Sequence, residues 1–105
     1  MSDSRWGRMS QTLAEAGIEN KITERSYAGG VSRSIQVRIN PTHILIVHDK
    51  WWTKNPDVWV GWSAYVENTR TALAVRDNGW KATKKRAEIR DFVLLIKAES
   101  ERGEL

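Results

Sequence analysis

Hydrophobic residues at the start of the chain recur every three or four positions, which is the spacing of one side of a helix. The pattern predicts a helix over residues 4–16, with Gly17 as its C-cap. Ile18 follows, and we expect its side chain to contact the last helical turn. The hydrophobic stripe of this helix consists of Trp6, Met9, Leu13 and Ala16.

Beyond residue 20 the hydrophobic positions alternate with polar ones, as they do along a β-strand. The pattern predicts strands over residues 21–27, 34–40, 43–48, 58–67 and 69–75. In the second run, Ile35, Val37 and Ile39 would face a core. Gln36 and Arg38 would face water. The third run is more densely apolar, which is typical of a central strand with both faces covered.

A last amphipathic segment predicts a helix over residues 84–101 with Thr83 as its N-cap. Its expected core stripe is Ile89, Phe92, Val93 and Ile96. The order of elements predicts an α+β fold: an N-terminal helix, a four- to five-stranded, mostly antiparallel sheet, and a long C-terminal helix packed on the sheet. A chain of 105 residues fits one compact domain over residues 1–105.

Tryptophan is concentrated in the middle of the chain, where five of the six indoles fall between residues 51 and 80. One pair is Trp51 and Trp52, and another is Trp59 and Trp62. Both separations are odd, so a strand would send the partners to opposite faces. We therefore expect some indoles outside the core as a contact surface, with Trp62 and Trp80 buried. The predicted aromatic contact residues are Trp51, Trp52, Trp59 and Tyr65.

Composition narrows the classes of function. Cysteine is absent, which excludes disulfides, thiol nucleophiles and thiolate metal sites. His43 and His48 are five positions apart in one predicted strand and would face opposite sides, so we expect neither a metal site nor an acid–base pair. We expect no enzyme activity and no cofactor. No run is apolar enough to span a membrane, and residues 1–5 do not read as a secretory signal, so a cytoplasmic protein is expected.

Basic residues are concentrated between residues 70 and 90. Seven Lys and Arg fall there against only two acidic residues, in a chain whose formal net charge is +4. At the start of the last predicted helix, unpaired backbone N–H groups add partial positive charge, which suits a phosphate or another anion. The alternative is a solvated basic face. The candidate nucleic-acid contacts are Arg70, Arg76, Lys81, Lys84, Lys85, Arg86 and Arg90.

The run NGWKATKKRAE over residues 78–88 follows a predicted hairpin. With it, the segment over residues 59–93 resembles the arm-type DNA-binding domain of phage-type tyrosine recombinases. In that family a three-stranded sheet precedes a helix start of the form Gly-aromatic-x-Thr-Lys-Lys-x-Ala, and here Ala82 is an additional residue before the threonine. The resemblance implies a DNA-facing sheet that includes Trp62, Tyr65 and residues 70–76.

Together these patterns favour a small, non-enzymatic nucleic-acid-binding module encoded by a phage or mobile element, with DNA favoured over RNA. Attraction to phosphate would supply affinity, and aromatic stacking would add to it. Lys84 and Lys85 ahead of a terminal helix also resemble the double-stranded RNA-binding domain. The alternative is a protein-interaction module, either an inhibitor or host-takeover factor or a self-associating subunit such as a homodimer, in which a Trp-rich patch contacts a protein.

Overall fold

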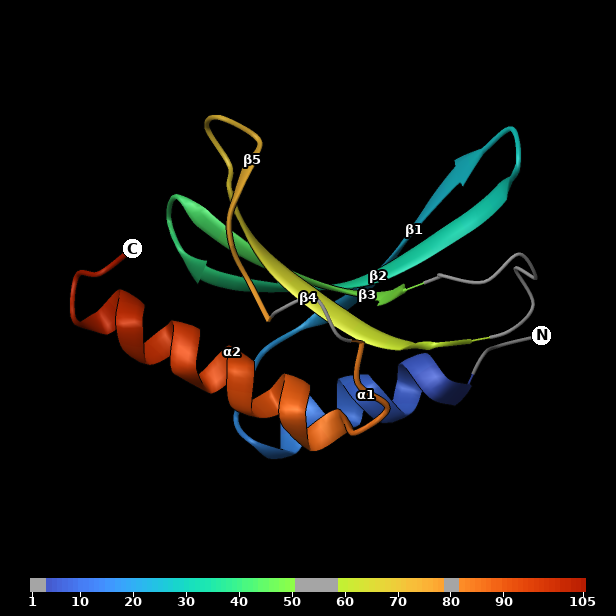
Figure 1. The fold of residues 1–105 in the computed structure, drawn as a ribbon, viewed down its shortest axis with the longest axis horizontal. Helices are drawn as coiled ribbons and strands as arrows, with labels where there is room; N and C mark the ends of the chain where they lie inside the picture. The colour runs from blue at the N-terminus through green and yellow to red at the C-terminus, as the bar shows by residue number, and fades with distance from the viewer. Residues whose placement is uncertain (1–3, 51–58, 79–81) are drawn as a thin grey trace.

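The computed structural model describes residues 4–50, 59–78 and 82–105 of the chain. A helix, a five-stranded antiparallel sheet and a second helix follow one another along the sequence (Figure 1). This arrangement confirms the predicted α+β class. The elements are α1 (Ser4–Glu15), β1 (Lys21–Tyr27), β2 (Gly30–Asn40), β3 (His43–Lys50), β4 (Gly61–Asn68), β5 (Leu73–Asp77) and α2 (Arg86–Glu101).

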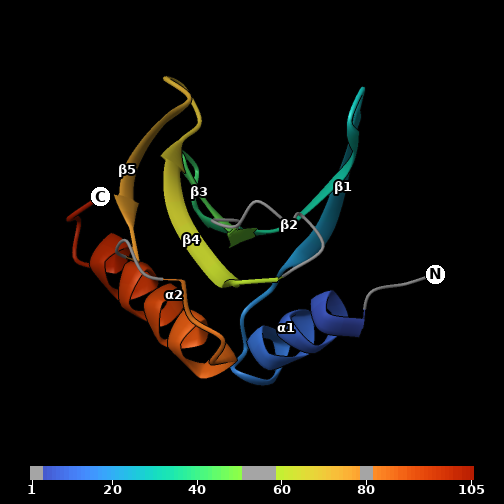
Figure 2. The ribbon, with the colours of Figure 1, turned by 45° about the vertical axis from the view of Figure 1, so that its right-hand side comes forward.

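The strands lie in the order β1-β2-β3-β4-β5, and each pairs antiparallel with its neighbour in sequence. Figure 2 shows that the sheet curves into a trough, with the β1–β2 hairpin rising on one side and β4–β5 on the other. Both helices lie against the outer, convex face (Figure 1). The concave face points away from the helices. The convex face therefore packs on both helices, and the concave face is covered by neither.

The hydrophobic core lies between the convex face and the helices. Alternation holds along β2, where Ile35 and Val37 are fully buried and Ile39 packs partly against the core, as predicted. The predicted stripe of α2 is also confirmed, with Phe92 its one partly buried member. The buried hydrophobic residues are Trp6, Met9, Leu13, Ile18, Ile35, Val37, Leu45, Val47, Trp62, Ala64, Val66, Ile89, Val93 and Ile96.

The end of α1 follows the predicted capping pattern. Gly17 has a φ of +76°, a conformation that glycine adopts without steric cost. The backbone N–H of Ile18 donates to the Leu13 carbonyl oxygen at 3.0 Å, and the Ile18 side chain is buried. The cap and the buried Ile18 therefore fix the position of the chain between α1 and β1.

Several boundaries differ from the sequence prediction. β4 begins at Gly61 rather than residue 58, and β5 begins at Leu73 rather than residue 69. A turn occupies the residues before β5, in which the Ala72 N–H donates to the Asn68 carbonyl oxygen at 2.8 Å. The helices cover only one face of β3, so the densely apolar run does not mark a strand enclosed by helices on both sides.

The predicted N-cap of the last helix is wrong. The backbone of Thr83 forms a bridge with Trp62, in which the Trp62 N–H donates to the Thr83 carbonyl oxygen at 2.7 Å and the Thr83 N–H donates back at 3.0 Å. The helix therefore begins later, at Arg86, with Lys85 as its N-cap. The Thr83 hydroxyl instead accepts the Lys85 N–H at 3.0 Å.

Candidate nucleic-acid interface

Register places a row of side chains across the whole concave face. Partners in adjacent strands share a face of the sheet, so the cross-strand pairs can be followed from one edge to the other. One row contains Lys21, Gln36, Ile46, Tyr65 and Asp77, one residue from each strand. Neighbouring rows contain Arg38, Ile44 and Glu67, then Thr23 with Ser34, and His48 with Ser63. This face carries mainly polar side chains together with Ile44, Ile46 and Tyr65, whereas the convex face carries the buried hydrophobic residues.

Two rings meet near the centre of this face. The centroids of His48 and Tyr65 are 5.5 Å apart, with an interplanar angle of 62°. The His48 Nδ1 lies 2.9 Å from the carbonyl oxygen of Asp49, which can only accept a hydrogen bond. In the neutral ring Nδ1 therefore carries the proton, and Nε2 is left as an acceptor toward a ligand. Tyr65 is the predicted aromatic contact residue that this face presents.

A groove of about 440 Å³ runs over these residues. Its lining includes Thr23, Ser34, Gln36, Ile46, His48 and Tyr65. The lining also includes Glu24, which pairs with Arg33, and Asp49, which pairs with Arg5. These charged, hydroxyl, amide and aromatic groups suit a polar ligand better than an aliphatic one. The alternation of hydrophobic and polar residues predicted that Gln36 faces water. It did not predict which residues of the other strands would lie beside Gln36.

Ser63 contributes a buried hydroxyl beside the groove. The residue is 4% exposed, and its Oγ has no hydrogen-bond partner within residues 4–50, 59–78 and 82–105. It lies directly opposite His48 in the β3–β4 pair. Because Oγ itself is buried and Ser63 does not line the groove, this hydroxyl is not open to a ligand in this structure.

Charge is graded across the concave face. Lys21 and Arg38 stand at the β1–β2 side, whereas Glu67 and Asp77 stand at the β4–β5 side. An anionic ligand is therefore attracted to the β1–β2 half and repelled from the other. Neither cation belongs to the basic cluster that the sequence singled out.

Trp59 does not lie on an exposed rim, which corrects the sequence prediction. Its ring packs against the core at 5.5 Å from the ring of Trp62, and the Arg5 guanidinium carbon lies 4.8 Å from its centroid. The parity argument fails because Trp59 precedes β4 and is not part of a strand. Trp62 is 1% exposed, as predicted, and it also contacts Trp6 edge-on at 4.9 Å. Trp62 and Tyr65 thus lie on opposite faces of the sheet.

The predicted basic contacts do not form one patch. Arg70 is exposed in the turn before β5, and Lys84 and Lys85 are exposed ahead of α2, on the helix side. Arg86 donates from Nε to the Thr12 hydroxyl at 3.3 Å, linking the two helices. Arg90 pairs with the neighbouring Asp91 at 3.0 Å.

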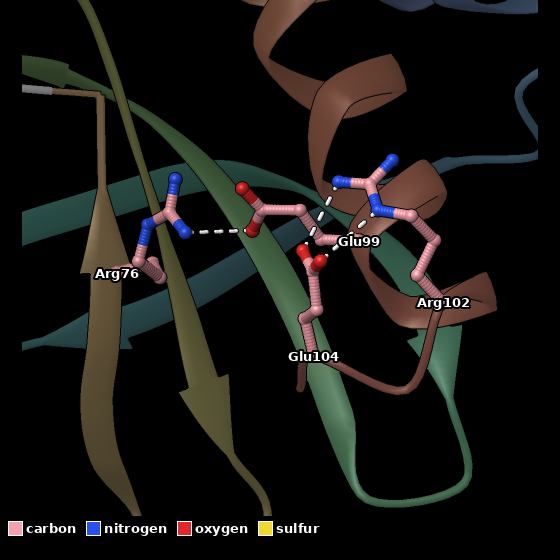
Figure 3. Close-up of polar contacts among 4 residues, drawn as sticks. All are labelled: Arg76, Glu99, Arg102 and Glu104. Atoms are coloured by element: carbon pink, nitrogen blue, oxygen red, sulfur yellow. Dashed lines mark hydrogen bonds and ion pairs between the residues drawn. The ribbon is translucent and has the colours of Figure 1, made fainter.

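Arg76 is engaged with the protein itself. Figure 3 shows its side chain reaching from β5 toward α2, where Nη1 lies 2.6 Å from Oε2 of Glu99. Glu99 is 9% exposed, so Arg76 compensates a buried carboxylate and is poorly suited to bind phosphate as well. Nearby, Arg102 and Glu104 form an exposed pair. Their hydrogen bond lowers the pKa of the Glu104 carboxyl and raises the pKa of the Arg102 guanidinium.

Four sequence predictions fall outside the described residues: Trp51, Trp52, Trp80 and Lys81. Among the described residues, no helix is long and apolar enough to cross a membrane. The same residues hold no group of three or more His, Cys, Asp or Glu side chains that could bind a metal ion. Comparisons with protein-family models, with curated proteins and with solved structures found no match to this chain.

Proposed function

We propose that this protein binds nucleic acid, and that a single strand lies along the concave face of the sheet. The observation that carries the proposal is the pair of rings, His48 and Tyr65, set in a polar groove on the face that neither helix covers. Sheets that bind single strands offer aromatic rings for base stacking and polar groups for base edges. The recombinase resemblance favours DNA over RNA as the ligand.

The charge gradient orients the strand on this face. Phosphates are attracted to the β1–β2 side, where Lys21 and Arg38 stand, and are repelled by Glu67 and Asp77 across the trough. The bases would then point toward the rings. Because the strand would occupy the concave side, the basic residues ahead of α2 would not contact it.

Tyr65→Ala should weaken binding of a labelled single-stranded oligonucleotide, because it removes a stacking ring worth about 1–3 kcal/mol. Fluorescence anisotropy at about 50 and 200 mM salt would measure the dissociation constants for DNA and RNA, single- and double-stranded. The matched variant Tyr65→Phe keeps the ring and should bind nearly as the natural protein does. Absence of binding to every nucleic acid at the lower salt would refute the proposed function.

Changing Lys84, Lys85 and Arg86 together to Gln tests the alternative binding surface, which is the basic start of α2 that the sequence predicted. The head of α2 lies on the helix side, and charges separated by more than about 8 Å are largely screened at physiological salt. We therefore expect the triple variant to weaken binding only a few-fold. A loss of tenfold or more here, with none in Tyr65→Ala, would move the interface to the start of α2.

A second candidate function is a protein interaction. Leu94 and Leu95, adjacent on α2, are 42% and 47% exposed, which is unusual for leucine in a helix that packs on a sheet. A protein interface built on such residues is nearly insensitive to salt, whereas phosphate binding weakens steeply between about 50 and 200 mM. Sedimentation of the protein across the same salt series separates self-association from nucleic-acid binding.

A further inference from the structure

A second groove, of about 390 Å³, opens beside the first and gathers three cations. Lys21 comes from the first residue of β1, Arg38 from β2 and Lys97 from α2. Glu19 is the one acidic residue among those that line the groove. Three like charges from three separate elements therefore share one depression in the surface.

The groove exists because β1 is shorter than β2. Pairing between them ends at Lys21 and Gln36, and β2 continues to Asn40 without a neighbour on that side. At this point the chain passes from α1 into the sheet. The side chain of Asn20 fixes the turn, since its Oδ1 accepts the Ser10 hydroxyl at 2.6 Å and its Nδ2 donates to the Ile18 carbonyl oxygen at 3.0 Å. These hydrogen bonds hold the backbone at Lys21 in a fixed position.

The other two cations also extend from regular elements of the fold. Arg38 lies within the β2–β3 ladder, and Lys97 follows the fully buried Ile96. The described residues contain no ion pair to any of the three cations. The contact of Arg38 Nη1 with the Asn40 carbonyl oxygen, at 3.5 Å, is long for a hydrogen bond. Three cations against the single carboxylate of Glu19 leave the lining of the groove with a net positive charge, which favours a bound anion.

The cationic groove continues the proposed path of the nucleic acid. Gln36 lines both grooves, and it stands in the same cross-strand row as Lys21 on one side and Tyr65 on the other. Two interstrand spacings of about 4.8 Å separate Gln36 from Tyr65. A strand whose bases reach the rings would thus have its backbone near the three cations.

We propose that Lys21, Arg38 and Lys97 bind a phosphodiester group of the strand, so that they form the main phosphate contact of the protein. This inference rests on the proposed function. The planar guanidinium of Arg38 can donate two parallel hydrogen bonds to phosphate oxygens, and the lysines add charge from either side. Gln36, between the grooves, can hydrogen-bond to the sugar or base that follows.

The test compares two double variants that lose the same charge. Lys21→Gln with Arg38→Gln should weaken oligonucleotide binding tenfold or more near 150 mM salt and reduce the salt slope by roughly 0.7–1.4. Arg8→Gln with Arg102→Gln is the control, because Arg8 is exposed on α1 and Arg102 is paired with Glu104 beyond α2. The control should leave the salt slope unchanged. Equal losses in both double variants would overturn the inference.

Inorganic pyrophosphate alone distinguishes this inference from the function on which it rests. We expect it to shift the amide NMR signals of Arg38 and Lys97 in the natural protein and not in the Lys21/Arg38 double variant. Oligonucleotide binding that depends on Tyr65 but not on Lys21 and Arg38 would leave the proposed function standing and overturn the phosphate site. Pyrophosphate shifts without any oligonucleotide binding would refute the nucleic-acid function and retain the site for a small phosphorylated ligand.

Discussion

Replacing Trp62 with alanine should lower the free energy of unfolding by about 3–5 kcal/mol, the range for a deleted buried aromatic side chain. The residue is 1% exposed, and its ring packs edge-on against Trp6 at 4.9 Å and Trp59 at 5.5 Å. Its removal would leave a cavity between α1 and β4 and would also remove two aromatic contacts. A urea titration followed by far-UV circular dichroism measures the change.

Two matched variants show whether this cost belongs to the buried position. Trp59→Ala removes the same side chain from a half-buried site outside the strands and should cost clearly less. Leu73→Ala, at a residue that is 65% exposed, should change stability by no more than about 0.5 kcal/mol. If Trp59→Ala destabilised the protein as much as Trp62→Ala, the core would extend over both indoles equally.

Local patterns predicted the elements whose side chains have a simple periodic environment. The stripe of α1 and the alternation along β2 were both read correctly, because each depends on burial of one side against the same core. Gly17 could be identified as a C-cap because a positive φ selects for glycine at that position. Such features depend on residues a few positions apart.

The prediction of an exposed Trp59 was wrong for a reason that the sequence does not contain. Parity assigns faces only within a strand, and β4 begins at Gly61, two residues after Trp59. The chain there places Trp59 and Trp62 on the same side, against Arg5. The N-cap prediction failed similarly, because the Thr83 backbone is used by the distant Trp62.

The cationic groove could not be predicted from local sequence. Lys21, Arg38 and Lys97 come from three elements, and their meeting depends on the β1–β2 register and on where α2 crosses the sheet. The basic run ahead of α2 is conspicuous in the sequence, yet Lys84 and Lys85 lie on the helix side and Arg86 contacts Thr12 of α1. Charge density along a chain therefore predicts a binding surface only when the fold keeps those residues on one face.

Curvature gives the two faces of the sheet their separate roles. The convex face carries the aliphatic and indole side chains that stabilise the fold against both helices. The concave face carries His48, Tyr65 and the graded charges. Because alternate residues of each strand serve the two faces, a substitution on the concave side can change the proposed binding surface with little effect on the core.

Gly61→Ala should destabilise the fold by roughly 2–4 kcal/mol, the sum of an overpacking cost of about 1–3 kcal/mol and a weakened hydrogen bond of about 1 kcal/mol. A Cβ at this position would lie 3.0 Å from the carbonyl oxygen of Thr83 and 3.1 Å from the Cβ of Ala82. That carbonyl accepts the Trp62 N–H at 2.7 Å, so relief of the clash must strain or break the bridge. The segment that leads into α2 would then lose its attachment to β4.

Gly7→Ala is the control for this variant, because the same methyl group in α1 would meet nothing within 4 Å. Glycine is a poor helix former, so Gly7→Ala should stabilise the protein by about 0.4–1 kcal/mol. Thermal and urea unfolding of the two variants should therefore shift in opposite directions. Hydrogen exchange of the Trp62 amide adds a local measurement, since Gly61→Ala should expose it if the bridge to Thr83 opens. Stability and Trp62 protection equal to those of the natural protein would contradict the close approach of the two segments, and with it the structural reason for glycine at position 61.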